Sequence, residues 1–291
     1  MKLYIKILLV SFLLIFLTGC PEEDNQPDGK NLFKGYLYYS NADNVYRIEM
    51  NTLKAEKLFS FASYPDIREN NKILILNKNT GTNKLIYTDI RALNQTTILA
   101  MDGALYSYNE NIHNPRLSYD NKYIAYNGGN SDRSIVYIID ANTGELKATI
   151  GDYGNKQPYK QPNWAPDGSL YVLGWPSMNE GIYKVSQDFK TIEHVFPNIT
   201  GASYPIVSPD GTKIAFVKND QLWTMNIDGT EAMQYNLSNE RFSNPTWSPD
   251  SKFIAASGKF SIFVFDLENN TYLDLISTSS VSPDDQMCWV Y

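Results

Sequence analysis

Cysteine and histidine are almost absent from this chain of 291 residues, which contains two of each. Two cysteines cannot form the disulfide framework of a small secreted domain or a zinc site of several cysteines. Two histidines exclude a metal centre that needs three imidazoles. We therefore expect neither a metal ion nor another cofactor.

Basic residues are scarce and scattered as well. Lys and Arg number 25 against 32 Asp and Glu, a formal net charge of −7, and they form no block. A negatively charged surface repels phosphate backbones, so we expect no nucleic-acid partner. Hydrophobic residues make up 43% of the chain and aromatic residues 13%, which is enough to fill a core and excludes a disordered chain.

The first 19 residues have the pattern of a secretory signal peptide. Lys2 and Lys6 precede an apolar run over 7–17, shorter than the roughly 20 residues with which a helix crosses a bilayer. The following Leu-Thr-Gly-Cys at 17–20 resembles a bacterial lipobox, whose cysteine is lipidated before cleavage. The resemblance implies that residues 1–19 are removed and that Cys20 becomes the lipidated first residue. An ordinary signal peptide that ends near a chance cysteine is the alternative.

Residues 20–32 are predicted to be a flexible acidic tether. The stretch 21–29 contains no apolar residue, so it cannot bury enough surface to offset its ordering entropy. Its acidic triplet at 22–24 resembles the export signal of surface-exposed lipoproteins in some Gram-negative bacteria. The N-terminus thus predicts a protein anchored by lipid in the cell envelope, at the outer membrane, facing the periplasm or the surface.

Two motifs recur at intervals of about 40 residues over 33–291. In the first, a proline is followed five residues later by Asp or Asn, then by a turn and an apolar run, as in PIVSPDGTKIAFV at 205–217. The second is a short alternating strand that closes on a polar residue, as at Asp140 and Asp266. The first motif occurs at Pro65, Pro115, Pro162, Pro205 and Pro245, with a partial sixth copy at 281–291.

Each repeat predicts four short antiparallel strands, the pattern of propeller blades. No stretch after residue 30 has the periodicity and caps of a ten-residue helix. Residues 36–60 contain three strands without a proline-led first strand, whereas 281–291 supplies such a strand and then stops. We therefore predict an all-β, six-bladed β-propeller over 33–291, a single domain in which the C-terminal strand joins the N-terminal blade and closes the ring.

The Ser-Pro-Asp-Gly-x-x-Ile-Ala-Phe pattern at 208–216 resembles the WD40-like repeats of the TolB β-propeller family. The resemblance covers residues 33–291 and is specific over 162–257. The unit at 65–100 departs from it, with Arg-Glu-Asn-Asn at 68–71 in place of Ser-Pro-Asp-Gly. TolB carries a separate N-terminal α/β domain, for which we expect no counterpart upstream of residue 33.

The repeated aspartates are expected to be structural. Asp accepts backbone N–H groups two residues further on, and equivalent residues of successive blades lie too far apart to act as a carboxylate pair. The same role is expected for the aspartates that open the hairpin turns. The residues are Asp120, Asp167, Asp210 and Asp250 in the proline motif, and Asp89, Asp140 and Asp266 at the hairpins. We expect His194 on an outer strand and Cys288 as a buried, inert thiol.

The candidate binding face lies in the loops that lead into the first strand of each blade. In a propeller these loops converge on one face around the channel mouth. Tyr and Arg suit such a face because they combine large contact area with a hydrogen-bonding tip. The candidates are Tyr64, His113, Tyr159, Tyr204, Arg241 and Phe242. If these rings instead pack between blades, the site would lie on the opposite face, among hairpins such as 140–144 and 226–230.

The sequence thus predicts a lipid-anchored envelope propeller that binds a protein or a glycan and has no catalytic activity. The alternative is a glycan-active enzyme on the same fold. That function would require two or three carboxylates at the channel mouth, where the loops that can be assigned are rich in Tyr and Asn instead.

Overall fold

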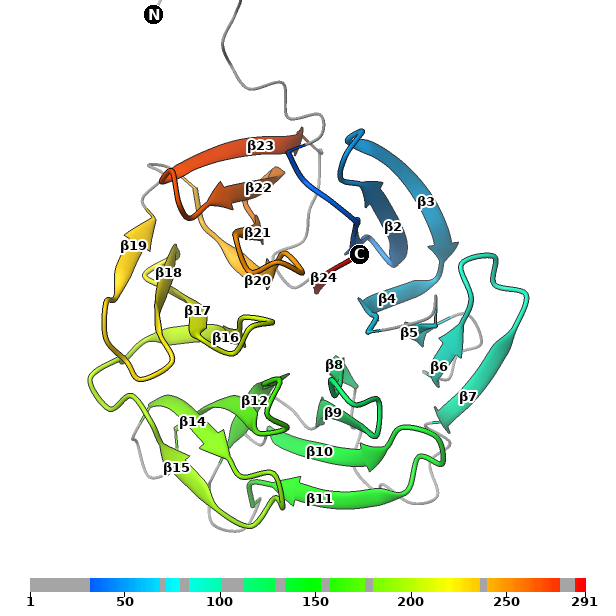
Figure 1. Cartoon of the computed structure of the whole chain (residues 1–291). Helices are drawn as coiled ribbons and strands as arrows, with labels where there is room; N and C mark the ends of the chain where they lie inside the picture. The colour runs from blue at the N-terminus through cyan, green and yellow to red at the C-terminus, as the bar shows by residue number, and fades with distance from the viewer. Residues whose placement is uncertain are drawn as a thin grey trace, which may run out of the picture.

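The computed structural model describes residues 32–68, 72–78, 84–100, 112–128, 134–152, 158–175, 180–235, 240–277 and 286–291. Within these residues, 24 strands form six antiparallel sheets of four strands, arranged as blades around a central axis (Figure 1). The predicted six-bladed propeller is therefore confirmed. The predicted signal peptide, the lipidated Cys20 and the tether up to residue 31 lie outside the described residues.

The blades follow the chain in order, each with its first strand innermost. Blade one consists of β24 (Met287–Val290), β1 (Tyr36–Asn41), β2 (Asn44–Glu49) and β3 (Lys54–Ser60). Blade two consists of β4 (Ala62–Asp66), β5 (Ile73–Asn77), β6 (Lys84–Thr88) and β7 (Gln95–Ala100). Blade three consists of β8 (His113–Leu117), β9 (Tyr123–Gly128), β10 (Ile135–Asp140) and β11 (Leu146–Ile150). Blade four consists of β12 (Tyr159–Trp164), β13 (Leu170–Gly174), β14 (Gly181–Val185) and β15 (Ile192–His194). Blade five consists of β16 (Ala202–Val207), β17 (Lys213–Lys218), β18 (Gln221–Asn226) and β19 (Met233–Tyr235). Blade six consists of β20 (Ser243–Trp247), β21 (Phe253–Ser257), β22 (Ser261–Asp266) and β23 (Thr271–Ser277).

Burial falls from the inner strands to the outer ones. Every residue of β13 and β21 is buried, because these strands are covered on both faces by neighbouring blades. The outermost strands β3 and β15 are mostly exposed, and His194 lies on β15 as predicted. Among the described residues, no helix is long and apolar enough to cross a membrane.

The two ends of the domain complete blade one. Strand β24 pairs with β1, with Val290 opposite Tyr36 and Met287 opposite Tyr39, as the sequence predicts for ring closure. Trp289 packs edge-on against Phe33 at 5.9 Å and lies over Phe253 of blade six. The closing strand therefore fills the core between the first and last blades.

The repeated polar residues have the structural roles expected of them. Asp210 accepts the N–H of Thr212 at 3.0 Å, and Asp140 accepts that of Asn142 at 2.9 Å. A tryptophan two residues after the proline links blades: Trp164 Nε1 donates to the carbonyl oxygen of Arg116 and Trp247 Nε1 to that of Ile206.

Candidate functional site

The innermost strands all run in the same direction along the axis. The loops that lead into them meet on one side, here called the loop face, and the aspartate turns that follow them meet on the other, the turn face. Each face carries a cavity on the axis, lined by residues from several blades. The two cavities are the candidate sites.

The residue directly before each repeat proline shapes the loop face. In five blades this residue has a positive φ, although it is not glycine, and the pairing of the innermost strand shifts register there. A positive φ is uncommon for such residues, and the proline further disfavours helical backbone before it. Because all five blades share the feature, we attribute it to a bulge of the repeat that redirects the side chain. The residues, with φ in degrees, are Tyr64 (55), Asn114 (49), Gln161 (55), Tyr204 (53) and Asn244 (47).

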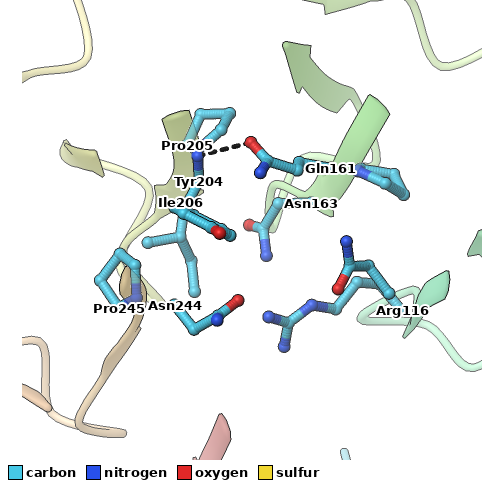
Figure 2. A pocket seen from close by; sticks show the side chains of 10 residues that line it. Arg116, Gln161, Asn163, Tyr204, Pro205, Ile206, Asn244 and Pro245 are labelled. Carbon is cyan, nitrogen blue, oxygen red and sulfur yellow. Dashed lines mark hydrogen bonds between the residues drawn. The ribbon is translucent and has the colours of Figure 1, made fainter. Parts of the chain in front are cut away.

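The loop-face cavity is small and polar. Its volume is ≈ 20 Å³, room for about one water molecule. Figure 2 shows Arg116, Asn163 and Asn244 pointing toward one another across it, while Gln161 accepts the backbone N–H of Tyr204 at 2.7 Å. Anything larger than water must therefore contact the rim of this face rather than its interior.

Three of the candidate residues lie around this rim. The Tyr64 hydroxyl is 3.0 Å from Nδ1 of His113, so a pair from β4 and β8 bridges blades two and three. The Tyr64 side chain is half-buried and that of His113 is exposed. Tyr204 is half-buried and lines the cavity. Arg241 is exposed in the loop before β20, with Nε 3.5 Å from the Asp220 carboxylate.

For Tyr159 and Phe242, exposure on a binding loop is wrong. Tyr159 is 4% exposed and stands edge-on to Tyr183, and burial raises its pKa to about 12. Phe242 is 3% exposed and packs against Phe263 and Phe265. Both stand three positions before the repeat proline, and that position is buried in all five blades. Its residues are Ala62, Ile112, Tyr159, Ala202 and Phe242.

Buried charge lies between the two cavities. Asp66 is fully buried and accepts the N–H of Leu117 at 2.6 Å, with Arg116 Nη1 3.7 Å from its other oxygen. Burial lowers the pKa of Arg116, although the nearby Asp66 carboxylate acts to raise it. Burial has the largest single effect on the pKa of Arg68 and acts to lower it, but Asp66, Tyr119 and Cys288 together outweigh burial and the net shift is upward. The described part of this cluster thus contains two guanidinium groups, those of Arg68 and Arg116, and one carboxylate, that of Asp66.

Cys288 adjoins this cluster from β24. Its thiol donates to the carbonyl oxygen of Ile67 at 3.4 Å, and burial raises its pKa to about 12. It is therefore the buried thiol that the sequence predicts. The neighbouring Gln286 donates to the carbonyl oxygens of Pro65 and Pro115, while its own side-chain oxygen is buried without a hydrogen-bond partner.

The turn-face cavity is much larger, at ≈ 370 Å³. Its wall is aromatic and apolar except for one guanidinium, that of Arg68. It is lined by Tyr36, Tyr38, Ile67, Arg68, Tyr119, Pro209, Pro249, Trp289, Val290 and Tyr291. None of the candidate residues chosen from the sequence lines this cavity. The departure from the repeat at 68–71, however, includes Arg68, which does line it. Among the described residues, no group of three His, Cys, Asp or Glu is placed to hold a metal ion.

The ring of four-stranded blades, four of which open on a proline-led strand and an aspartate turn, defines a six-bladed propeller built of proline–aspartate repeats. Residues 84–289 match the TolB beta propeller domain, which covers more than half of the chain. The chain therefore belongs to the TolB β-propeller family.

Solved structures of similar fold support this assignment. TolB from Acinetobacter baumannii superposes with a TM-score of 0.68 at 14% identity, over 88% of this chain and 67% of its own. A putative TolB from Agrobacterium tumefaciens gives 0.62 at 16% identity, over 87% and 96%. An oligogalacturonate lyase in complex with manganese gives 0.57 at 12% identity, over 81% and 71%. At these identities the likeness shows the fold alone.

A relative in sequence is an uncharacterized protein of Agrobacterium fabrum. It is 27% identical over 150 residues, which is 46% of this chain and 50% of the relative. The chain thus spans about half the length of this curated relative.

Proposed function

We propose that the protein is a lipid-anchored, non-enzymatic propeller of the cell envelope that captures a protein partner on its loop face. The observation that carries the proposal is the loop face, where Tyr204 lines a cavity of only ≈ 20 Å³ and the Tyr64–His113 pair bridges blades two and three. Membership in the TolB β-propeller family supports an envelope location and a protein partner.

The size of the loop-face cavity favours a protein partner over an enclosed small molecule. Pockets for small ligands measure roughly 300–1,000 Å³, far more than this cavity offers. A protein surface can instead rest on the rim and place its own side chains over the amides beneath. Tyrosine and arginine are the residues most often decisive in such contacts, and both occur on this rim.

A glycan-active enzyme is less well supported. Glycosidases use a pair of carboxyl groups on either side of the bond that is cleaved. The described residues that line the loop-face cavity are amides, prolines, Tyr204, Ile206 and Arg116, without a carboxylate. The oligogalacturonate lyases show that the fold can hold an enzyme, but the described lining of the loop-face cavity offers no carboxylate pair for such a mechanism.

Lipid anchoring would attach the propeller to the membrane from the side opposite the loop face. The chain joins blade one at Gly35, next to Val290 at the end of β24 and therefore at the turn face. If Cys20 holds the lipid, residues 20–31 allow a distance of at most about 40 Å between membrane and propeller. The loop face is then directed away from the membrane and remains open to a partner.

Photo-crosslinking in cells tests the loop face. A photoreactive amino acid at His113 or Arg241 should give discrete protein adducts, whereas one at Leu93 or Tyr272, both exposed near outer strands, should not. For the partner so identified, Tyr204→Asn should raise the Kd at least tenfold at constant melting temperature, because asparagine already stands at the equivalent positions 114 and 244. Adducts from the outer positions alone, or an unchanged Kd, would contradict the proposal.

A further inference from the structure

Blade two departs from the repeat at the residue that normally closes the aspartate turn. In blades three, five and six this residue is serine, and Ser208 Oγ accepts the N–H of Lys213 at 3.0 Å and donates to Asp210. Blade two has Arg68 there instead. Its Nε donates to the carbonyl oxygen of Leu117 on blade three at 3.0 Å, so the side chain crosses to the neighbouring blade.

Blade three departs from the repeat one position further on. Pro209 and Pro249 occupy this position in blades five and six, whereas blade three has Tyr119. The guanidinium of Arg68 lies over the Tyr119 ring, 4.3 Å from its centroid. Two departures from the repeat thus contact each other and form one wall of the turn-face cavity, while the two regular prolines lie on another.

The charge of this wall favours an anion. Arg68 lines this wall, and Arg116 lies behind it on the side of the loop-face cavity. Both lie near Asp66, so in the described part of the cluster one carboxylate faces two guanidinium groups. Buried charges are stable only when they are paired. The aromatic face of Tyr119 holds the Arg68 guanidinium by a cation–π contact, and arginine in such a setting is suited to bind a carboxylate.

The remaining walls favour a ring that is partly apolar and partly polar. Tyr36 and Tyr291 each combine an aromatic body with a hydroxyl tip, and Tyr291 is 73% exposed at the rim. Tyr38 adds a buried ring to the same wall. The volume of ≈ 370 Å³ is within the range of small-ligand sites. A sugar ring matches these walls because it has both C–H faces and hydroxyl groups.

We propose that the turn-face cavity binds an acidic sugar, a hexuronate unit whose carboxylate pairs with Arg68 and whose ring lies among the tyrosines. This site is separate from the loop face, so a protein partner there and a sugar here are independent.

Calorimetric titration of the detergent-solubilised full-length protein tests the proposal. Galacturonate should bind, and galactose, which has no carboxylate, should bind at least tenfold more weakly. Arg68→Ser, which introduces the residue of blades three, five and six, should raise the Kd for galacturonate at least tenfold. Arg91→Ser, at an exposed position between β6 and β7, should leave the Kd unchanged. Tyr291→Ala gives a second variant at an exposed position and should also weaken binding.

Benzoate and inorganic phosphate separate the sugar from other anions. Either of them binding as tightly as galacturonate would overturn the sugar assignment. Absence of galacturonate binding by the wild-type protein, or an unchanged Kd in folded Arg68→Ser, would overturn the site.

Discussion

At the scale of single residues, position relative to the repeat proline decides what a side chain does. The residue directly before the proline lies at the loop-face mouth, as Tyr204 does, whereas the residue three before it is buried between strands, as Tyr159 is. The Tyr159 ring lies so close to Gly174 that a Cβ there would be 2.4 Å from it. Aromatic character alone therefore could not separate binding residues from core residues.

Tyr159→Ala should destabilise the fold by about 3 kcal/mol or more, because it removes a buried ring that the neighbouring strands cannot replace. Arg241→Ala, at an exposed position, should change the free energy of unfolding by less than about 0.5 kcal/mol. Chemical denaturation of both variants provides the measurement. A Tyr159→Ala protein as stable as the wild type would show that the ring contributes little to the core.

At the scale of elements, blade one is decisive because it is built from both ends of the domain. The chain passes Val290 so closely at Gly35 that a Cβ would lie 1.9 Å from the Val290 carbonyl oxygen, and Gly35 has a φ of +84°. The pairing of β1 with β24 thus depends on a residue without a side chain.

Gly35→Ala should accordingly be more destabilising than Gly201→Ala. Both glycines have a positive φ, which costs alanine about 1–2 kcal/mol, but nothing lies within 4 Å of a Cβ at Gly201. The overlap at Gly35 should add ~1–3 kcal/mol. Thermal unfolding of the two variants compares them directly; equal melting temperatures would mean that β24 is not held tightly against β1.

At the scale of the whole molecule, we expect the N-terminal sequence to determine where the propeller is held. If Cys20 receives the lipid, as we propose, Cys20→Ser should abolish labelling by a fatty-acid probe and release the protein from the membrane fraction. The melting temperature should stay unchanged, since the substitution lies outside the strands. Membrane fractionation and probe labelling are the measurements, and a variant that stays membrane-bound and labelled would show that the anchor is elsewhere.

The repeat itself determined the blades. A proline, an aspartate turn and an alternating strand every 40 or so residues specify four strands locally, and the incomplete units at the two ends predict ring closure. The structural roles of Asp210 and Asp140 also follow from the sequence, because their hydrogen bonds reach only two or three residues along the chain.

The sites depended on contacts between blades. Arg68 and Tyr119 are 51 positions apart, and only the packing of blade two against blade three brings the guanidinium over the tyrosine ring. Burial of Tyr159 and Phe242 likewise depends on how neighbouring strands and blades cover them. Local pattern specifies a strand and its turn, but exposure and cavity shape are properties of surfaces that meet only in the folded ring.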